Sequence, residues 1–432
     1  MKAKQNKINR RNFLKTVGAA GLAPVLAGVT NRSALGQTEA GPNEPNTVEP
    51  NAPKKEEPKL PQVPRRKLGR TGVEVPCLAL GATFDTVENQ TVLRKALEWG
   101  VTYWDTADTY AGGNSEAGIG KFLEKNPEMR QKHFIVTKAF GTKTIEETEV
   151  HLQTSLRKMN TRYVDLYLIM DRQKNEHGLS DPEQLTNDGG RLERWVKFAK
   201  RRKMIRFFGF STHKNMAKCL AAAAKLYWID AIMTSYSFRL MQDAAMQDAI
   251  SACQQAGVGL IAMKTQAFGQ KVETEEDKKL VDHFLQRGFT EGQAKIKAVL
   301  EDKRISSVCS TMDNIGTLTS NVAAVLDKTE LTQKDFDVLK KYAAATCTGY
   351  CAGCAHICDQ ALPDIPYVSD IMRYLMYYNN YGEKEKAREL FAKVPGNVRN
   401  KLLRTDYGAA EARCPQRLPI GRLIAEAVSK LA

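Results

Sequence analysis

The 432-residue sequence lacks features that would point to several common classes of protein. Its composition, with 42% hydrophobic, 26% charged and 8% aromatic residues, is not that of a multi-span membrane protein or a disordered chain. No Gly-x-Gly-x-x-Gly motif follows the first predicted strand. Residues 1–36 contain no acidic residue but seven Lys or Arg, which leaves +8 of the formal charge of +15 for the rest of the chain. That remainder is interspersed with Asp and Glu rather than clustered with aromatic residues, so nucleic-acid binding is not expected.

The basic N-terminal segment, residues 1–36, resembles a twin-arginine export signal. Its run Asn9-Arg10-Arg11-Asn12-Phe13-Leu14-Lys15 precedes a mildly apolar stretch, residues 16–30, and Ala34-Leu35-Gly36 has the two small residues of a cleavage site. The stretch is short and rich in Gly and Ala, so no membrane span is expected after cleavage. The alternative is a basic amphipathic tail. The resemblance implies a periplasmic protein exported in the folded state.

Residues 37–64 are predicted to form an extended linker. They hold seven of the chain's sixteen prolines, mixed with Glu, Asn and Lys. Such a composition favours a semi-rigid spacer between the export signal and the first folded domain.

Residues 65–326 alternate short apolar runs with amphipathic helical patterns, which predicts parallel strands joined by helices. Eight units in about 260 residues match a (β/α)8 TIM barrel, with a doubly wound open sheet as the alternative. The helical patterns include one that begins at a Thr144-x-x-Glu147 capping box. The predicted strands are residues 78–81, 102–105, 134–138, 163–170, 206–211, 231–235, 258–263 and 306–310.

Three polar residues are predicted to meet at the carboxyl ends of the barrel strands, where the active sites of such barrels lie. Asp105 closes the second strand, Tyr110 follows in its loop, and Lys138 closes the third. An ammonium beside a phenol favours the phenolate, so Lys138 is expected to lower the pKa of Tyr110, while Asp105 holds the lysine. The alternative is a structural Lys–Asp ion pair with an ordinary turn tyrosine.

Residues 65 to 326 resemble the aldo-keto reductase family. The segment Arg66-Lys67-Leu68-Gly69-Arg70-Thr71-Gly72-Val73-Glu74-Val75-Pro76 is similar to the hairpin that plugs the bottom of the family's barrel. The segments Asp105-Thr106-Ala107-Asp108-Thr109-Tyr110 and Ile135-Val136-Thr137-Lys138 are similar to the family's catalytic strand ends. The resemblance implies hydride transfer between a nicotinamide cofactor and a small carbonyl, sugar or alcohol, with Tyr110 as the acid, Lys138 as its modulator and Asp105 as their partner.

The fourth catalytic position departs from the family pattern. Val164-Asp165-Leu166-Tyr167-Leu168-Ile169 leads to Met170, where most members have histidine. A thioether is a weak acceptor and cannot donate a proton. Either a neighbour such as Asp171 or Arg172 orients the substrate, or the reductase activity is weak or absent.

The expected cofactor-binding residues also depart in part from the family. Ser211, in Gly209-Phe210-Ser211-Thr212-His213, matches the polar residue near the nicotinamide carboxamide. After the seventh strand, Met263 replaces the usual aromatic residue, and Lys264 is expected to meet the pyrophosphate as a point charge.

After the eighth strand, Ser310 and Asp313, followed by Asn321, stand where the family commonly has Pro-Gly and a basic residue. Asp313 would repel a 2′-phosphate and accept from ribose hydroxyls. The sequence therefore leaves NAD, NADP and no nucleotide open.

The C-terminal region, residues 327–432, is rich in cysteine. It is expected to be a small, mainly helical domain. Five of the nine cysteines fall there, whereas Cys77, Cys219, Cys253 and Cys309 are isolated and expected to be buried. The five are Cys347, Cys351, Cys354, Cys358 and Cys414. Their pattern, with Pro after the last, resembles a ferredoxin-type iron–sulfur module.

The ferredoxin resemblance implies one 4Fe-4S cluster on Cys347, Cys351, Cys354 and Cys414. The first spacing is three residues where the bacterial pattern has two, so the alternative is that Cys358 is the fourth ligand and Cys414 the spare cysteine. Disulfides and a structural zinc are the competing hypotheses. The helical patterns at residues 371–378 and 418–431 are expected to pack around the cysteines.

Two functions follow from the sequence. The first is an exported nicotinamide-dependent oxidoreductase with an appended cluster that is structural or serves an electron-transfer partner. The second is a catalytically silent barrel that binds a carbohydrate, a carbonyl ligand or a redox partner. Met170 favours the second, and the joint presence of Asp105, Tyr110 and Lys138 favours the first.

Overall fold

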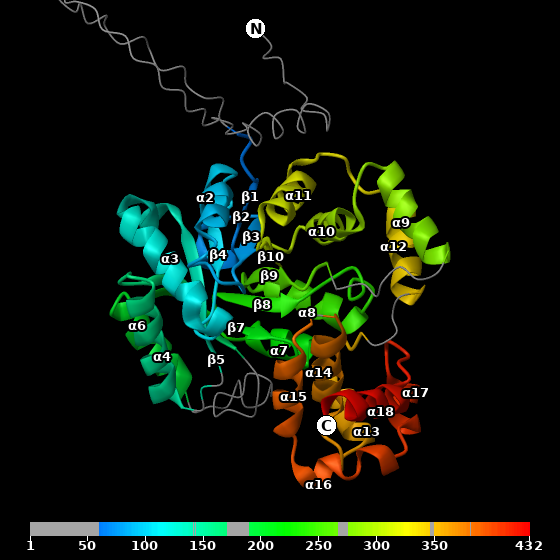
Figure 1. The fold of residues 1–432 in the computed structure, drawn as a ribbon. Helices are drawn as coiled ribbons and strands as arrows, with labels where there is room; N and C mark the ends of the chain where they lie inside the picture. The colour runs from blue at the N-terminus through cyan, green and yellow to red at the C-terminus, as the bar shows by residue number, and fades with distance from the viewer. Residues whose placement is uncertain are drawn as a thin grey trace, which may run out of the picture. The chain divides into compact units, whose positions relative to one another are not determined.

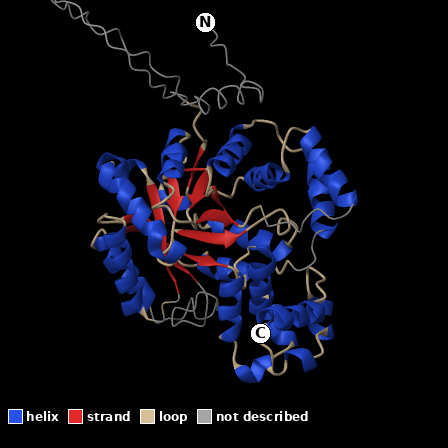
Figure 2. Ribbon diagram, viewed as in Figure 1, coloured by secondary structure: helices blue, strands red, loops and turns tan. Residues whose placement is uncertain are grey.

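Eight parallel strands close into a barrel within the residues that the computed structural model describes, which are 60–140, 142, 144–170, 190–266, 275–345, 350–380 and 382–432. Figure 2 shows these strands in the centre with helices around them. The order around the barrel is β10-β3-β4-β5-β6-β7-β8-β9. The bounds are β3 (Leu78–Gly81), β4 (Tyr103–Asp105), β5 (Phe134–Phe140), β6 (Val164–Met170), β7 (Ile205–Thr212), β8 (Ala231–Ser235), β9 (Gly259–Met263) and β10 (Ser307–Thr311). The predicted (β/α)8 barrel is confirmed, and the open sheet is excluded.

The strands match the predicted apolar runs because a parallel barrel strand is covered on both faces. Every residue of β6 is buried, for example. The register places Phe140, Met170 and Ser211 side by side at the ends of β5, β6 and β7. Since all eight strands run the same way, their carboxyl ends form one rim.

Helices follow the strands and cover the barrel. The start of α4 (Ile145–Lys158) lies where the Thr144 pattern predicts it, because the Thr144 hydroxyl accepts a hydrogen bond from the Glu147 amide at 3.1 Å. The other helices up to residue 345 are α2 (Gln90–Glu98), α3 (Asn114–Lys125), α6 (Arg191–Arg201), α7 (Met216–Ala223), α8 (Ala244–Gln255), α9 (Glu275–Gln286), α10 (Glu291–Glu301), α11 (Ile315–Leu326) and α12 (Gln333–Ala345).

A hairpin of β1 (Arg65–Lys67) and β2 (Glu74–Pro76) closes the amino-terminal end of the barrel, as the resemblance implied. Leu68, in its turn, is fully buried and packs with residues that point into the barrel. Gly259, at the start of β9, makes room for it, because a Cβ there would lie 2.6 Å from a Leu68 methyl group. The other end of the barrel remains free for a site.

The C-terminal segment, residues 350–432, is helical and has its own apolar core. The two predicted helices are present as α14 (Val368–Asn380) and α18 (Ile420–Leu431), whose buried residues include Ile371, Leu375 and Ile424. In Figure 1 they pack with the remaining helices of this segment. Those are α13 (Ala355–Ala361), α15 (Lys384–Ala392), α16 (Gly396–Arg399) and α17 (Gly408–Arg413). Residues 60–432 form one compact unit.

Several predicted features lie outside the described residues. They are the export signal at 1–36, nearly all of the linker, and Asp171, Arg172 and Cys347. Among the residues that are described, no helix is long and apolar enough to span a membrane.

Candidate active site

A cavity of about 740 Å³ lies at the carboxyl ends of the barrel strands. Its wall includes the last residues of six strands, as expected for chemistry at the top of such a barrel. Those residues are Gly81, Asp105, Phe140, Met170, Met263 and Thr311. Tyr110 lines the cavity as well.

Asp105 and Lys138 form a buried ion pair at the base of the cavity. Lys138 Nζ donates to Asp105 Oδ2 at 2.6 Å and to the Thr106 carbonyl oxygen at 2.8 Å. Burial opposes the charge on Lys138, but the carboxylate of Asp105 outweighs it and raises the pKa of the lysine. Lys138 is thus a fixed cation. It lies within β5, which runs two residues beyond the predicted strand end.

Tyr110 is positioned above this pair by the short 3-10 turn Tyr110–Gly113 that follows β4. Lys138 Nζ lies 5.0 Å from the centroid of its ring. Burial raises the pKa of Tyr110 to about 12, although the charge of Lys138 acts in the opposite direction. Lys138 therefore acts on the pKa of Tyr110 in the expected direction, but the net shift of that pKa is upward. Desolvation of the phenolate outweighs the nearby cation, so the phenol stays protonated and can donate.

Cys309 is a member of the site that sequence reasoning missed. As predicted for the isolated cysteines, it is buried, but it also lines the cavity from β10. Its thiol lies beside the Asp105 carboxylate, and burial raises its pKa well above the ordinary value. It is therefore a neutral thiol rather than a nucleophilic thiolate.

Some of the predicted cofactor residues line the cavity and others do not. Ser211, on β7, and Lys264, after β9, both line the cavity. Lys264 has a positive φ of 56°, and its Nζ lies 5.4 Å from the centroid of the Tyr377 ring. Asp313 is exposed, accepts a hydrogen bond from Asn314, and is not among the cavity residues.

Ser310 and Asn321 join a polar cluster with Gln266, which the sequence analysis did not select. Ser310 Oγ donates to Gln266 Oε1 at 2.8 Å and accepts from Asn321 Nδ2 at 3.1 Å. Gln266 Nε2 donates to Asn321 Oδ1 at 3.2 Å. Ser310 and Gln266 line the cavity, and the fully buried Asn321 fixes them.

One wall of the cavity comes from the C-terminal segment. Tyr377 on α14 and residues of α15 and its flanks face the barrel rim. Lys386 pairs with Glu383 at 2.7 Å, and its Nζ also lies 5.3 Å from the centroid of the Tyr377 ring. The other residues of this wall are Glu389, Leu390 and Lys393. A site at the barrel mouth is thus completed by a part of the chain more than 250 residues away from Asp105.

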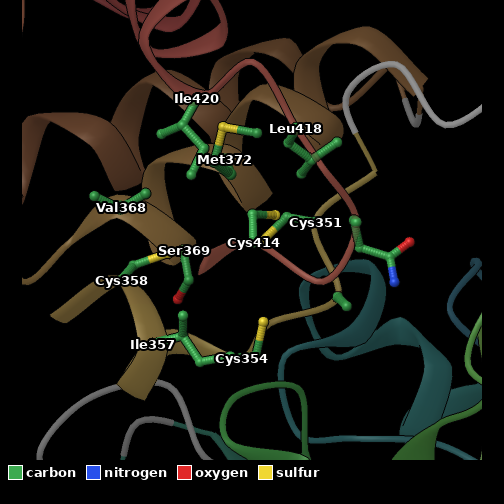
Figure 3. Close-up of a pocket in the computed structure, with 12 residues that line it drawn as sticks. Cys351, Cys354, Ile357, Cys358, Val368, Ser369, Met372, Cys414, Leu418 and Ile420 are labelled. Atoms are coloured by element: carbon green, nitrogen blue, oxygen red, sulfur yellow. The ribbon is translucent and has the colours of Figure 1, made fainter. Parts of the chain in front are cut away.

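Four cysteines line a second, separate pocket inside the C-terminal segment (Figure 3). They are Cys351, Cys354, Cys358 and Cys414. The rest of the lining is largely apolar and includes Ile357, Val368 and Met372. Burial raises the pKa of Cys354 and of Cys358 to about 12. Within the described residues, no group of three or more His, Cys, Asp or Glu is arranged to hold a single metal ion.

Comparison with known proteins assigns the chain to a family. The model of the aldo/keto reductase family matches residues 78–344, and the chain belongs to this family. It is 28% identical over 218 residues to an aldo-keto reductase of Schizosaccharomyces pombe named for NADP(+), a match that covers 46% of this chain and 60% of that protein. It is 30% identical over 183 residues to an aldo-keto reductase of Gibberella moniliformis, covering 41% and 51%.

A solved structure gives the same result for the fold. The chain resembles a thermostable aldo-keto reductase crystallised with the inhibitor epalrestat, with a TM-score of 0.53 and 25% identity. The match covers 65% of this chain and all of the other. The chain is therefore an oxidoreductase-family barrel with an additional C-terminal segment.

Proposed function

We propose that the protein is an exported, nicotinamide-dependent carbonyl reductase with a 4Fe-4S cluster in its C-terminal segment. The observation that carries the reductase function is the joint placement of Asp105, Lys138 and Tyr110 at the strand-end cavity. The substrates that the family implies are small carbonyl compounds or sugars, and a cavity lined by both polar and apolar side chains can hold them.

Each of the three residues has a separate task. The Tyr110 phenol gives its proton to the carbonyl oxygen of the substrate as the alcohol forms. Lys138 stabilises the phenolate that remains, and Asp105 holds Lys138 in place. A nicotinamide nucleotide, when bound in the cavity, would supply the hydride.

Residues on the β7, β9 and β10 side of the cavity fit a nicotinamide nucleotide. Ser211 offers a hydroxyl, Lys264 a positive charge, and the Ser310–Gln266 pair further donors and acceptors. The relative from Schizosaccharomyces pombe is named for NADP(+), and Asp313 lies outside the cavity lining. Both points support NADP over NAD.

Nucleotide titration tests the reductase. NADPH and NADH are added anaerobically to the chain lacking residues 1–36, after a check for co-purified nucleotide, and quenching of intrinsic fluorescence is followed. We expect tight binding of NADPH and turnover of aldehydes that Tyr110→Phe abolishes. If neither nucleotide binds and none co-purifies, the reductase proposal fails. Turnover that survives Tyr110→Phe would show that Tyr110 is not the acid, and nucleotide binding without any turnover would favour the silent barrel that Met170 suggests.

The cysteine pocket supports an iron–sulfur cluster through its donor set. Thiolates are the ligands that clusters use, and four cysteine side chains line this one largely apolar pocket. We propose Cys351, Cys354 and Cys414 as three ligands. Cys358 lines the same pocket, which supports it as the fourth, whereas Cys347 of the ferredoxin pattern lies outside the described residues.

Anaerobic iron and sulfide analysis tests the cluster. We expect roughly four irons and four sulfides per chain, as a cubane requires. Cys347→Ser and Cys358→Ser then identify the fourth ligand, since only its replacement lowers the iron content strongly. A folded preparation without iron overturns the proposal.

Export rests on residues 1–36 alone. We propose the twin-arginine route, which carries folded proteins and so permits a cofactor to be acquired before export. Replacing Arg10 and Arg11 by lysine is expected to retain the full chain in the cytoplasm, whereas Lys2→Arg is a control in the same segment. Equal periplasmic recovery of both variants would refute this route.

A further inference from the structure

The cavity contains a histidine that does not stand at the fourth catalytic position. Met170, at the end of β6, has no proton to donate. Among the described residues that line the cavity, His213 alone carries an imidazole. It lies two residues after Ser211, and Ser211 is paired with Met170 across the β6–β7 ladder. The thioether and the imidazole therefore come from neighbouring strand ends of one cavity.

The backbone of His213 is held by the C-terminal segment. Arg373 on α14 donates from Nη2 to the His213 carbonyl oxygen at 2.7 Å. Gly353, between two cysteines of the pocket, approaches the same oxygen so closely that a Cβ would lie 2.1 Å from it. The contact therefore requires glycine at position 353, which also has a φ of +78°.

The two residues after His213 are tied to the same segment. Lys214 Nζ forms an ion pair with Asp370 at 2.9 Å. The Asn215 amide donates to the Gly353 carbonyl oxygen at 2.8 Å, and the Asn215 side-chain oxygen accepts from the His356 amide at 2.8 Å. A loop after a barrel strand is ordinarily free to move, and this one is fixed at three consecutive residues.

We propose that His213 binds and orients the substrate carbonyl in place of the missing histidine, and that the C-terminal segment positions it. The proposal rests on the proposed reductase function. Reduction adds a hydride to the carbonyl carbon and a proton to its oxygen. Tyr110 gives that proton and is reprotonated from water, whereas His213 donates a hydrogen bond and transfers no net proton. Arg373 is a positioning residue because it acts through His213.

The first test separates hydrogen bonding by His213 from a structural role. Reduction of 4-nitrobenzaldehyde by NADPH is measured for the full chain and for His213→Leu and His213→Gln. We expect His213→Leu to lower kcat/KM roughly tenfold to a hundredfold, as for a lost hydrogen bond to a reacting group, and His213→Gln to restore most of it through its amide donor. His283→Gln is the matched control, since His283 pairs with Asp335 and is not a cavity residue.

The outcomes distinguish the two proposals. If Tyr110→Phe abolishes turnover but His213→Leu does not reduce it, the reductase stands and the role of His213 is wrong. If His213→Gln has as low a kcat/KM as His213→Leu while both variants fold, a hydrogen bond from His213 to the substrate carbonyl is also refuted. If the unmodified chain neither binds nucleotide nor reduces the aldehyde, the reductase proposal fails instead.

A second readout needs no turnover. The six histidines are labelled with ¹³C at Cε1, and His213→Gln assigns the His213 signal in the NMR spectrum. Adding 4-nitrobenzoate, the carboxylate counterpart of the substrate, is expected to shift this signal and to leave that of His283 unchanged. An unmoved His213 signal under saturating 4-nitrobenzoate overturns the proposal.

A double-mutant cycle tests positioning by Arg373. We expect Arg373→Leu to lower kcat/KM severalfold in the unmodified chain and to have no further effect in the His213→Leu background. Iron content is measured in parallel, to show that the cysteine pocket is intact. Equal losses in both backgrounds would show that Arg373 does not act through His213.

Discussion

Replacing Gly353 by alanine disrupts the close approach of the cysteine-bearing loop to the His213 carbonyl oxygen. The left-handed backbone alone costs about 1–2 kcal/mol for an L-residue. The His213 oxygen would also have to withdraw by about 1 Å, because a Cβ at 2.1 Å must reach at least 3.0 Å. Separating the two segments in this way breaks the hydrogen bond from the Asn215 amide to the Gly353 carbonyl oxygen, at about 1 kcal/mol. It also weakens the hydrogen bond from Arg373 to the His213 oxygen, at about 1.5 kcal/mol. We therefore expect a local destabilisation of about 4 kcal/mol.

Gly382→Ala is a control with the same backbone penalty and no clash. Gly382 has a φ of +69°, and nothing lies within 4 Å of the place that a Cβ would occupy. The assay is hydrogen exchange of the Asn215 amide, which donates to Gly353. We expect this amide to exchange at least roughly a hundredfold faster in Gly353→Ala, because each 1.4 kcal/mol of local destabilisation raises the population of the open state tenfold. In Gly382→Ala we expect its exchange rate to be unchanged. Equal exchange in the two variants would refute the tight contact at His213.

Two further predictions concern the barrel. Lys138→Met leaves the Asp105 carboxylate buried without its cation, so we expect a loss of about 3–5 kcal/mol in the free energy of unfolding, followed by tryptophan fluorescence in urea. Adding Asp105→Asn should recover most of it, and a double variant as unstable as the single one would contradict the ion-pair argument. Burial lowers the pKa of His133, whose ring centroid lies 4.1 Å from that of Trp104. The unfolded chain therefore takes up the proton first, and stability falls as the pH drops below about 6.5. Between pH 7.5 and 5, His133→Phe should lose less stability than the unmodified chain, and an identical pH dependence would count against this assignment.

The barrel could be predicted because its determinants are local. Each strand is a short apolar run, Asp105 ends such a run, and Tyr110 lies in the loop that follows it. Their meeting with Lys138 then follows from the rule that parallel strands end at one rim. What the sequence could not give is the degree of burial, which decides the direction of the pKa shift of Tyr110.

Contacts between distant segments were also beyond sequence reasoning. Cys309 has the pattern of an ordinary core residue, and only the closed barrel brings it beside Asp105. The spacing of the cysteines predicts that either Cys358 or Cys414 is not needed as a cluster ligand. In the structure both line one pocket, because α17, which precedes Cys414, packs against α13, which carries Cys358. His213 carried no signal of its own, since its significance depends on Arg373 and Gly353 far along the chain.

The wall that α14 and α15 add to the cavity lies, along the chain, between Cys358 and Cys414. The family model ends at residue 344, so this wall is an addition to the common barrel. Its exposed residues, such as Glu389 and Lys393, can change without disturbing a barrel strand. Natural variation in substrate choice among proteins of this architecture should therefore accumulate in the segment of α14 and α15, outside the barrel. New specificities can then evolve there while the reacting groups of the barrel stay constant.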